Sequence, residues 1–180
     1  MEKIQYYTTP LYEFNLVKQK YECFCFLQHL MIAGNKTDEI KIGVYSLYLE
    51  FLSSLYEFYI AGGIRAGLIS GKNHIKNEEL IMLEVDKLVN RFFQTETLDV
   101  IPREFATQFR KIRNFKSHTS KMCISKCPSV TEFYRKYHKY IMILMQPPLF
   151  SWNFSTELWE DINLFAEEII SSNAEIKIEN

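Results

Sequence analysis

Apolar side chains recur at spacings of three and four residues along most of this chain, which limits what it can fold into. Phe105, Phe109 and Ile112 are a clear case. This spacing places apolar side chains on one face of an α-helix, whereas strands alternate with a period of two. The 180 residues include only 6 Gly and 5 Pro, too few for the turns of a β-sandwich of this length. The sequence therefore predicts an all-α, single-domain helical bundle of five to six helices.

The helices are expected at about residues 10–33, 37–69, 76–93, from 103 onward, 130–146 and 155–172. Gly34 and Asn35 resemble a helix C-cap, and Thr37 is a suitable N-cap for the second helix. Gly62 and Gly63 are expected to bend the second helix or to allow a close helix crossing. Residues 119–129 are predicted to form a loop. One domain is expected over residues 1–180, with a frayed polar tail at about 173–180.

The side chains at the helical spacing predict which faces of these helices are buried. The apolar side of the third helix is expected to contain Leu80, Leu83, Val85, Leu88 and Phe92. The tyrosines of the second helix, from Tyr45 to Tyr59, are expected to lie in the core or at a subunit interface. Stacking on nucleic-acid bases is the less favoured reading of this stripe. The run from 140 to 145 fits either helix or strand by propensity alone.

Composition and cysteine spacing exclude several classes of protein. No basic start followed by a long apolar run marks a secretory signal, and no apolar stretch is long enough to span a membrane. We therefore expect a cytoplasmic protein with reduced thiols and no membrane contact. Four cysteines form the patterns C-x-C and C-x3-C, unlike the C-x2-C of zinc ribbons. The cysteines are Cys23, Cys25, Cys123 and Cys127. Buried thiols are favoured over a zinc site, for which His29 and His138 would be the available histidines. No metal or cofactor is expected.

Positive charge is concentrated in one segment, residues 103–126. It contains seven basic side chains and one acid, Glu104, a net charge of +6, although the whole chain carries −1. The basic residues are Arg103, Arg110, Lys111, Arg113, Lys116, Lys121 and Lys126. Such a segment attracts polyanions even when the protein as a whole is nearly neutral.

The same segment holds side chains suited to phosphodiester chemistry, Arg113, Asn114 and His118. Arginine presents a planar fork of donors that matches a phosphate, and histidine exchanges protons near neutral pH. An amide beside them can orient either group. Cleavage of RNA by the ribose 2′-hydroxyl needs a base, a cation at the transition state and an acid for the leaving oxygen. Side chains alone can fill these roles.

The spacing of Arg113 and His118 sets a geometric condition. On a straight helix they lie about 140° apart, whereas Asn114 and His118 share a face. Two interpretations are open. Either the helix ends or distorts between Arg113 and His118, or two copies of the chain contribute these side chains to one cleft across a two-fold axis.

The residues R-N-F-K-S-H, Arg113 to His118, resemble the R-N-x-x-x-H signature of the HEPN superfamily. The resemblance implies a helical bundle, a homodimer with a composite active site, and catalytic roles for Arg113 and His118 supported by Asn114. It also implies a metal-independent endoribonuclease that leaves 2′,3′-cyclic phosphate ends. Single-stranded RNA or tRNA is the expected substrate, in a toxin, toxin–antitoxin or abortive-infection (antiviral-defence) setting.

Several further residues have candidate roles. Arg110, Lys111, Lys116 and Lys121 are candidates for contacts to RNA phosphates, with plain solubility as the competing explanation. The family often places an acid from an earlier helix near the Arg–His pair, which makes Glu50, or else Glu57, a candidate orienting acid.

The residue two positions after His118 bears on how the protein could be regulated, and alternatives to an enzyme stay open. Related toxins carry a tyrosine two residues after the histidine, whereas this chain has Ser120, which puts tyrosine-directed silencing by an antitoxin in doubt. An antitoxin or other regulatory protein nevertheless stays a candidate partner. A non-catalytic module that binds nucleic acid or nucleotide, and a structural helical subunit, are the alternatives to an enzyme.

Overall fold

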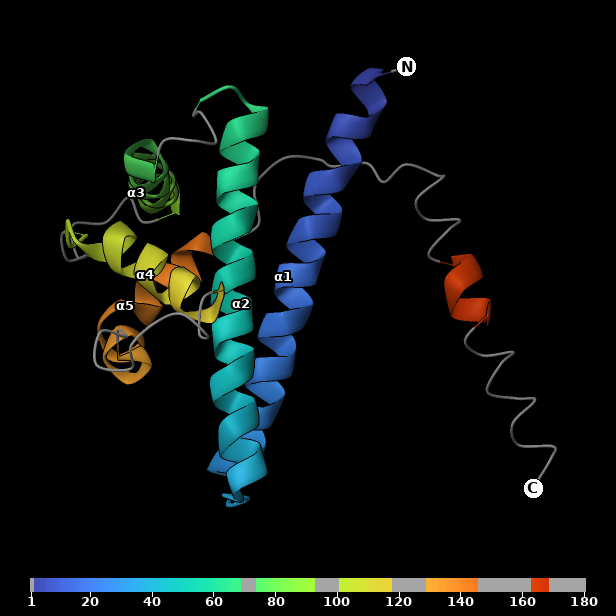
Figure 1. Ribbon diagram of the computed structural model, residues 1–180, viewed down its shortest axis with the longest axis vertical. Coiled ribbons are helices and arrows are strands. Elements are labelled where there is room, and N and C mark those ends of the chain that lie inside the picture. Colours follow the sequence, from blue (N-terminus) through green and yellow to red (C-terminus); the bar gives the residue numbers. More distant parts are fainter. Residues whose placement is uncertain (1, 69–73, 93–100, 118–128, 146–162, 169–180) are drawn as a thin grey trace. The chain divides into compact units, whose positions relative to one another are not determined.

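The computed structural model describes the backbone of residues 2–68, 74–92, 101–117, 129–145 and 163–168 (Figure 1). All regular secondary structure in these ranges is α-helix, so the predicted all-α class is confirmed. The helices are α1 Glu2–Ile32, α2 Asp38–Arg65, α3 His74–Phe92, α4 Phe105–Ser117 and α5 Val130–Leu144. Residues 163–168, inside the predicted sixth helix, are also helical. The predicted loop at 119–129 lies, except for Ser129, outside the described residues, as does the polar tail.

The chain groups into two compact units. One unit is Glu13–Pro148, and the other joins Met1–Tyr12 to Leu149–Asn180. The larger unit contains α2 to α5 and the part of α1 from Glu13 onward, and all contacts discussed below lie within it. The expectation of one domain over residues 1–180 stays a prediction.

An antiparallel hairpin of α1 and α2 is joined by a series of aromatic pairs. As the residue number rises along α1, that of the partner on α2 falls by the same amount, so the helices run in opposite directions (Figure 1). The ring centroids lie 5.0–5.3 Å apart in the pairs Phe14–Phe58, Tyr21–Phe51 and Phe24–Tyr48. Aromatic packing of this kind adds to simple area burial. The burial of Tyr48 and Tyr56 confirms a core role for the tyrosine stripe, although Tyr45 is exposed.

The turn between α1 and α2 follows the predicted capping residues. Gly34 has a φ of 105°, and the amide of Asn35 donates to the carbonyl of Leu30 at 3.0 Å. This is the closing bond of a left-handed C-cap, where glycine avoids the penalty of a Cβ. The Thr37 hydroxyl accepts from the amide of Ile40 at the start of α2. Both predicted caps are confirmed.

The helices α1 and α2 approach each other closely at Gly43. A Cβ at Gly43 would lie 2.7 Å from Cδ1 of Leu27, whereas a Cβ at Gly62 would meet nothing within 4 Å. Gly62 therefore does not lie at a close crossing, and the expected bend or crossing at Gly63 stays a prediction. The close approach at Gly43 could not be predicted, because this glycine lies inside an uninterrupted helical pattern. The contact also depends on the position of Leu27 on another helix.

The second helix ends earlier than the predicted residue 69. Gly67 has a φ of 68°, and the amide of Leu68 donates to the carbonyl of Gly63 at 2.9 Å. This is again a glycine C-cap, so α2 ends at Arg65. The apolar run continues to Ile69, which masked the glycine as a stop signal.

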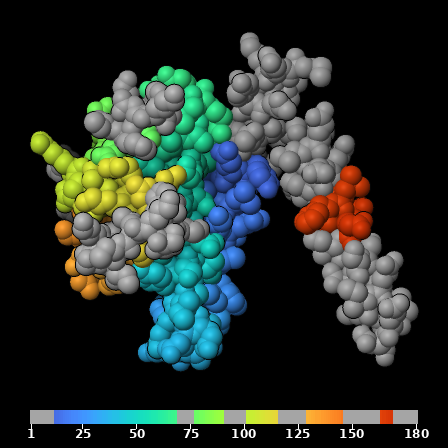
Figure 2. Space-filling model, viewed as in Figure 1, coloured from blue at the N-terminus to red at the C-terminus, as the bar shows by residue number. Residues whose placement is uncertain are grey.

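The helix α4 packs against three others and carries the core of the bundle. It contacts α2, α3 and α5, and part of it lies at the surface beside α2 (Figure 2). Phe105, Phe109 and Ile112 are fully buried, which confirms the predicted face. The Phe109 ring meets Tyr56 of α2 edge-on at 5.1 Å, and Phe105 lies 5.4 Å from Tyr140 of α5. Anchors on both sides fix the rotation of α4 about its axis.

The buried side of α3 differs from the prediction at one position. Ile81 is fully buried, whereas Leu83 is 47% exposed. Residues two apart on a helix point to nearly opposite sides, so Leu83 cannot accompany both Ile81 and Val85.

None of the helices in the described ranges combines the length and apolar character needed to cross a bilayer.

Candidate functional site

The polar residues of α4 follow directly from the burial of its apolar face. Arg113 and Asn114 come immediately after Ile112, so they lie at the edge of the buried face and are half-buried. Arg110, one turn earlier, is half-buried in the same way, and Lys111 is exposed. The buried aromatic residues Phe105 and Phe109 fix the rotation of α4 and therefore the positions of its arginines.

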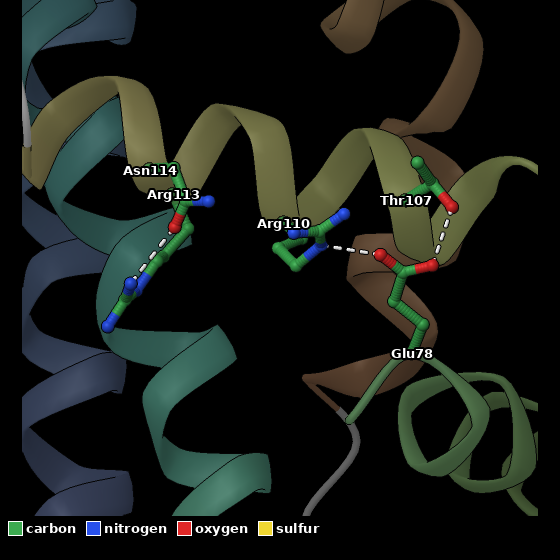
Figure 3. A network of polar contacts seen from close by, with 5 residues as sticks. All are labelled: Glu78, Thr107, Arg110, Arg113 and Asn114. Atoms are coloured by element: carbon green, nitrogen blue, oxygen red, sulfur yellow. Dashed lines mark hydrogen bonds and ion pairs between the residues drawn. The ribbon is translucent and has the colours of Figure 1, made fainter. Parts of the chain in front are cut away.

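Arg113 is held by two acceptors. Its Nε donates to Oε1 of Glu57 on α2, and its Nη2 forms an ion pair with the same oxygen. Its Nη1 donates to the Asn114 side-chain oxygen at 3.0 Å (Figure 3). A carboxylate on one edge and an amide oxygen at one terminus restrict the rotation of the guanidinium, which preorganises it for an anion.

The acid that contacts Arg113 is Glu57. The sequence favoured Glu50 as the orienting acid and considered Glu57 as its alternative. The two lie seven residues apart on α2, about 10 Å along the helix axis. Glu57 contacts Arg113, and a role for Glu50 stays a prediction.

Arg110 is held by a different helix. Its Nε donates to Oε1 of Glu78 on α3, and the Thr107 hydroxyl donates to Oε2 of the same carboxylate at 2.8 Å (Figure 3). Glu78 therefore joins α3 to two successive turns of α4. This network was not predicted, because Glu78 and Arg110 are 32 residues apart in sequence.

The tyrosine Tyr56 lies near both ion pairs. Its ring packs on Phe109, and it precedes Glu57 in α2. Burial raises the pKa of Tyr56 to about 12; Glu78 and Glu57 raise it further, whereas Arg110 and Arg113 lower it. These influences place the hydroxyl within electrostatic reach of all four charges. It is a neutral donor at physiological pH.

The remaining predicted site residues are placed only in part. The backbone of Lys116 belongs to the last turn of α4, but its side chain is outside the described part. His118 and Lys121 fall in the undescribed segment 118–128. The described helix α4 ends at Ser117, the residue before His118. Convergence of Arg113 and His118 within one chain or between two chains is therefore still open.

A second histidine has a structural environment that the sequence did not reveal. The Nδ1 of His138 shares a hydrogen bond with the Tyr48 hydroxyl at 3.1 Å, and the ring stacks on Tyr134 at 4.4 Å. Burial lowers the pKa of His138. The imidazole is thus kept neutral between Tyr48 of α2 and Tyr134 of α5.

The cysteines differ from the expected buried thiols. Cys23 is exposed and Cys25 is half-buried, so the expectation is wrong for Cys23. Both lie on α1 two residues apart, which points their side chains to different faces. Cys123 and Cys127 are outside the described residues. No group of three or more His, Cys, Asp or Glu side chains suited to a metal occurs in the part of the chain that is described.

Comparison with known proteins adds no relative to this picture. No protein-family model, no curated protein and no solved structure matches the chain. The geometry around α4 is therefore the basis for a function.

Proposed function

We propose that this protein is a metal-independent endoribonuclease of the HEPN type. The observation that carries the proposal is the state of Arg113, which is oriented by Glu57 and Asn114 on a helix that leads directly to His118. An arginine fixed in this way is suited to the charge that develops on a phosphate during transfer. The substrate is RNA, single-stranded or tRNA, because unpaired segments allow in-line attack by the 2′-hydroxyl.

The proposed reaction is a transesterification within the RNA. A base removes the 2′-hydroxyl proton, O2′ attacks the adjacent phosphorus, and the bond from phosphorus to the 5′-oxygen breaks. The leaving oxygen takes a proton, so the products are a 2′,3′-cyclic phosphate and a free 5′-hydroxyl. His118 moves a proton, Arg113 stabilises the charged phosphorane, and Asn114 keeps the guanidinium in place.

The dimer is part of this proposal. A homodimer brings His118 and Arg113 of two chains to one cleft if they do not converge within a chain. An equimolar mixture of Arg113→Ala and His118→Ala chains tests the arrangement, because mixed dimers of a composite site regain one intact cleft. Activity restored only on mixing supports a site made by two chains, and no recovery contradicts it.

RNA cleavage in EDTA is the direct test. Purified wild type is expected to cut RNA and leave cyclic phosphate ends. His118→Ala is expected to be slower by about 10²–10⁴-fold, the usual contribution of a general acid or base. His29→Ala, an exposed histidine at the end of α1, is the matched control and is expected to retain activity. Equal rates for His118→Ala and wild type contradict the proposal.

The cellular role follows from the chemistry. We propose a cytoplasmic toxin or antiviral-defence effector, held in check by an antitoxin or another regulatory protein. Induced expression of the wild type is expected to arrest growth with fragmented RNA, and His118→Ala is expected to remove both effects. Growth arrest by His118→Ala with intact RNA contradicts this role.

A further inference from the structure

The hydroxyl of Tyr56 is buried and makes no hydrogen bond to any of the described residues. The residue is 4% exposed. Leaving a buried hydroxyl without a partner costs free energy, and such groups in folded proteins call for an explanation. A ligand that completes the hydrogen bond is one such explanation.

Other tyrosines in the core contrast with Tyr56. The Tyr59 hydroxyl, three residues later on α2, donates to the carbonyl of Leu144 at 2.6 Å. Tyr48, two turns before Tyr56, shares its hydrogen bond with His138. Among the described residues, the neighbouring hydroxyls therefore have partners, and the hydroxyl within electrostatic reach of the two arginines of α4 has none.

Arg110, the second arginine that influences Tyr56, is only partly engaged. Arg110 contacts Glu78 through Nε, and no hydrogen bond to the described residues involves its two terminal nitrogens. Its side chain is 31% exposed. The carboxylate thus orients the guanidinium from one edge, while the terminal fork, which binds phosphate oxygens bidentately, is directed elsewhere.

We propose that Tyr56, Arg110 and Arg113 form one phosphate-binding subsite in which the Tyr56 hydroxyl donates to a phosphate oxygen. The ligand is a phosphate of an RNA strand, and this identity rests on the proposed ribonuclease function. Arg110 contributes its terminal nitrogens, and Arg113 contacts the same phosphate. Because the hydroxyl oxygen is covered in the free protein, the two arginine side chains shift when the phosphate enters.

The charges around the subsite agree with this role. Glu57 and Glu78 compensate the two arginines in the free protein, so the cluster is close to neutral before RNA binds. The raised pKa of Tyr56 keeps its proton on the oxygen and available for donation. A neutral donor within electrostatic reach of two oriented cations is matched to an anionic oxygen and gives no advantage to a cation.

Removal of the hydroxyl separates this role from a structural one. Tyr56→Phe is expected to leave the melting temperature unchanged or higher, because no hydrogen bond of the free protein is lost. The Kd for a single-stranded RNA that carries 2′-O-methyl groups and cannot be cleaved is expected to rise about tenfold, a typical effect of one hydrogen bond to a charged group. Tyr59→Phe is the matched control, with a lower melting temperature and an unchanged Kd.

A double-mutant cycle tests whether the residues share one phosphate. Arg110→Gln is expected to reduce the slope of log binding constant against log salt by about 0.7, the contribution of one phosphate contact to single-stranded nucleic acid. The losses for Tyr56→Phe and Arg110→Gln are expected to be less than additive when combined, because either change weakens the same contact. Additive losses overturn the shared subsite.

The binding and cleavage assays keep the two proposals apart. Cleavage by wild type together with unchanged binding and cleavage by Tyr56→Phe overturns the subsite and leaves the ribonuclease standing. Loss of affinity in Tyr56→Phe and Arg110→Gln, with no cleavage by wild type, supports the subsite and contradicts the enzyme. Absence of both RNA binding and cleavage in wild type overturns both proposals.

Discussion

Two regions of the molecule pair an arginine with a glutamate, and they do so in different ways. Between α1 and α2, Arg65 turns its terminal fork to Glu13, with Nη1 and Nη2 at 3.2 and 2.9 Å from the two carboxylate oxygens. On α4, by contrast, Arg110 and Arg113 contact their glutamates through Nε, and Arg113 does so through Nη2 as well. Both terminal nitrogens of Arg65 contact one carboxylate, whereas Arg110 contacts its glutamate through Nε and Arg113 shares its nitrogens between Glu57 and the Asn114 amide.

The surroundings of the pairs differ in the same sense. Arg113 has the amide of Asn114 beside it, and Tyr56 places an unpaired hydroxyl near both arginines of α4. An ion pair at a half-buried position is in itself weak support for a function, since many such pairs are structural. Two features say more about function: which edge of the guanidinium the carboxylate contacts, and which other polar groups lie near the arginine.

The largest expected effect breaks the comparison at the arginines themselves. Arg113→Gln is expected to lower kcat for RNA cleavage by about 10²–10³-fold, the range seen when one donor to a transition-state oxyanion is removed. Arg65→Gln is expected to cleave RNA at the wild-type rate. Single-turnover cleavage in EDTA measures both. Comparable losses in the two variants contradict the distinction drawn between the pairs.

A smaller effect is expected at the carboxylates. Glu57→Gln is expected to lower kcat about tenfold with little change in KM, because the guanidinium remains but loses the charged group that orients it. Glu13→Gln is the matched control, with kcat expected at the wild-type value. Initial rates over a range of RNA concentrations provide the measurement. A rise in KM alone for Glu57→Gln argues against a positioning role.

The pair on α1 and α2 is expected to affect stability rather than activity. Arg65→Gln is expected to lower the free energy of unfolding by about 1 kcal/mol, the upper end for partly exposed ion pairs, since the geometry is bidentate. Urea unfolding followed by circular dichroism measures the change. A loss well above this value shows that Arg65 also supports the packing of the hairpin.

The smallest effect sharpens the contrast between the two histidines, His138 and His118. Burial lowers the folded-state pKa of His138, so the unfolded chain binds more protons between that value and its ordinary pKa of about 6.5. Its contribution to stability is present above about pH 6.5 and is lost as the pH falls toward the folded pKa. His138→Gln is expected to flatten this part of the stability profile.

Urea midpoints between pH 5 and 8 give this profile, and the pH dependence of kcat is measured alongside. The kcat profile is expected to be the same in His138→Gln, because that histidine packs against Tyr48 and Tyr134. A changed kcat profile in this variant contradicts a purely structural role for His138.

Local features of the fold could be predicted from the sequence. The caps at Gly34 and Thr37, and the buried face of α4, depend on residues that are neighbours along the chain or lie a turn apart. Leu83 was misplaced because two apolar stripes of α3 overlap in sequence. Only packing against the other helices decides between them.

The partners within the site could not be predicted in the same way. Glu57 and Arg113 are 56 residues apart, and the competing candidate Glu50 lies on the same helix two turns away. The rotation and register of α4 against α2 bring Glu57 to Arg113, and neither can be read from the sequence. The isolation of the Tyr56 hydroxyl depends on what its neighbours lack, for which no sequence pattern exists.

The two tethers of α4 also have a mechanical consequence. Glu57 connects the second half of α4 to α2, and Glu78 connects its first half to α3. The helix α4 therefore bridges α2 and α3. Movement of α3 along α2 would strain both ion pairs at once and change the distance between the two guanidinium groups. A protein bound to α3 would therefore alter the spacing of these charges without contacting the arginines.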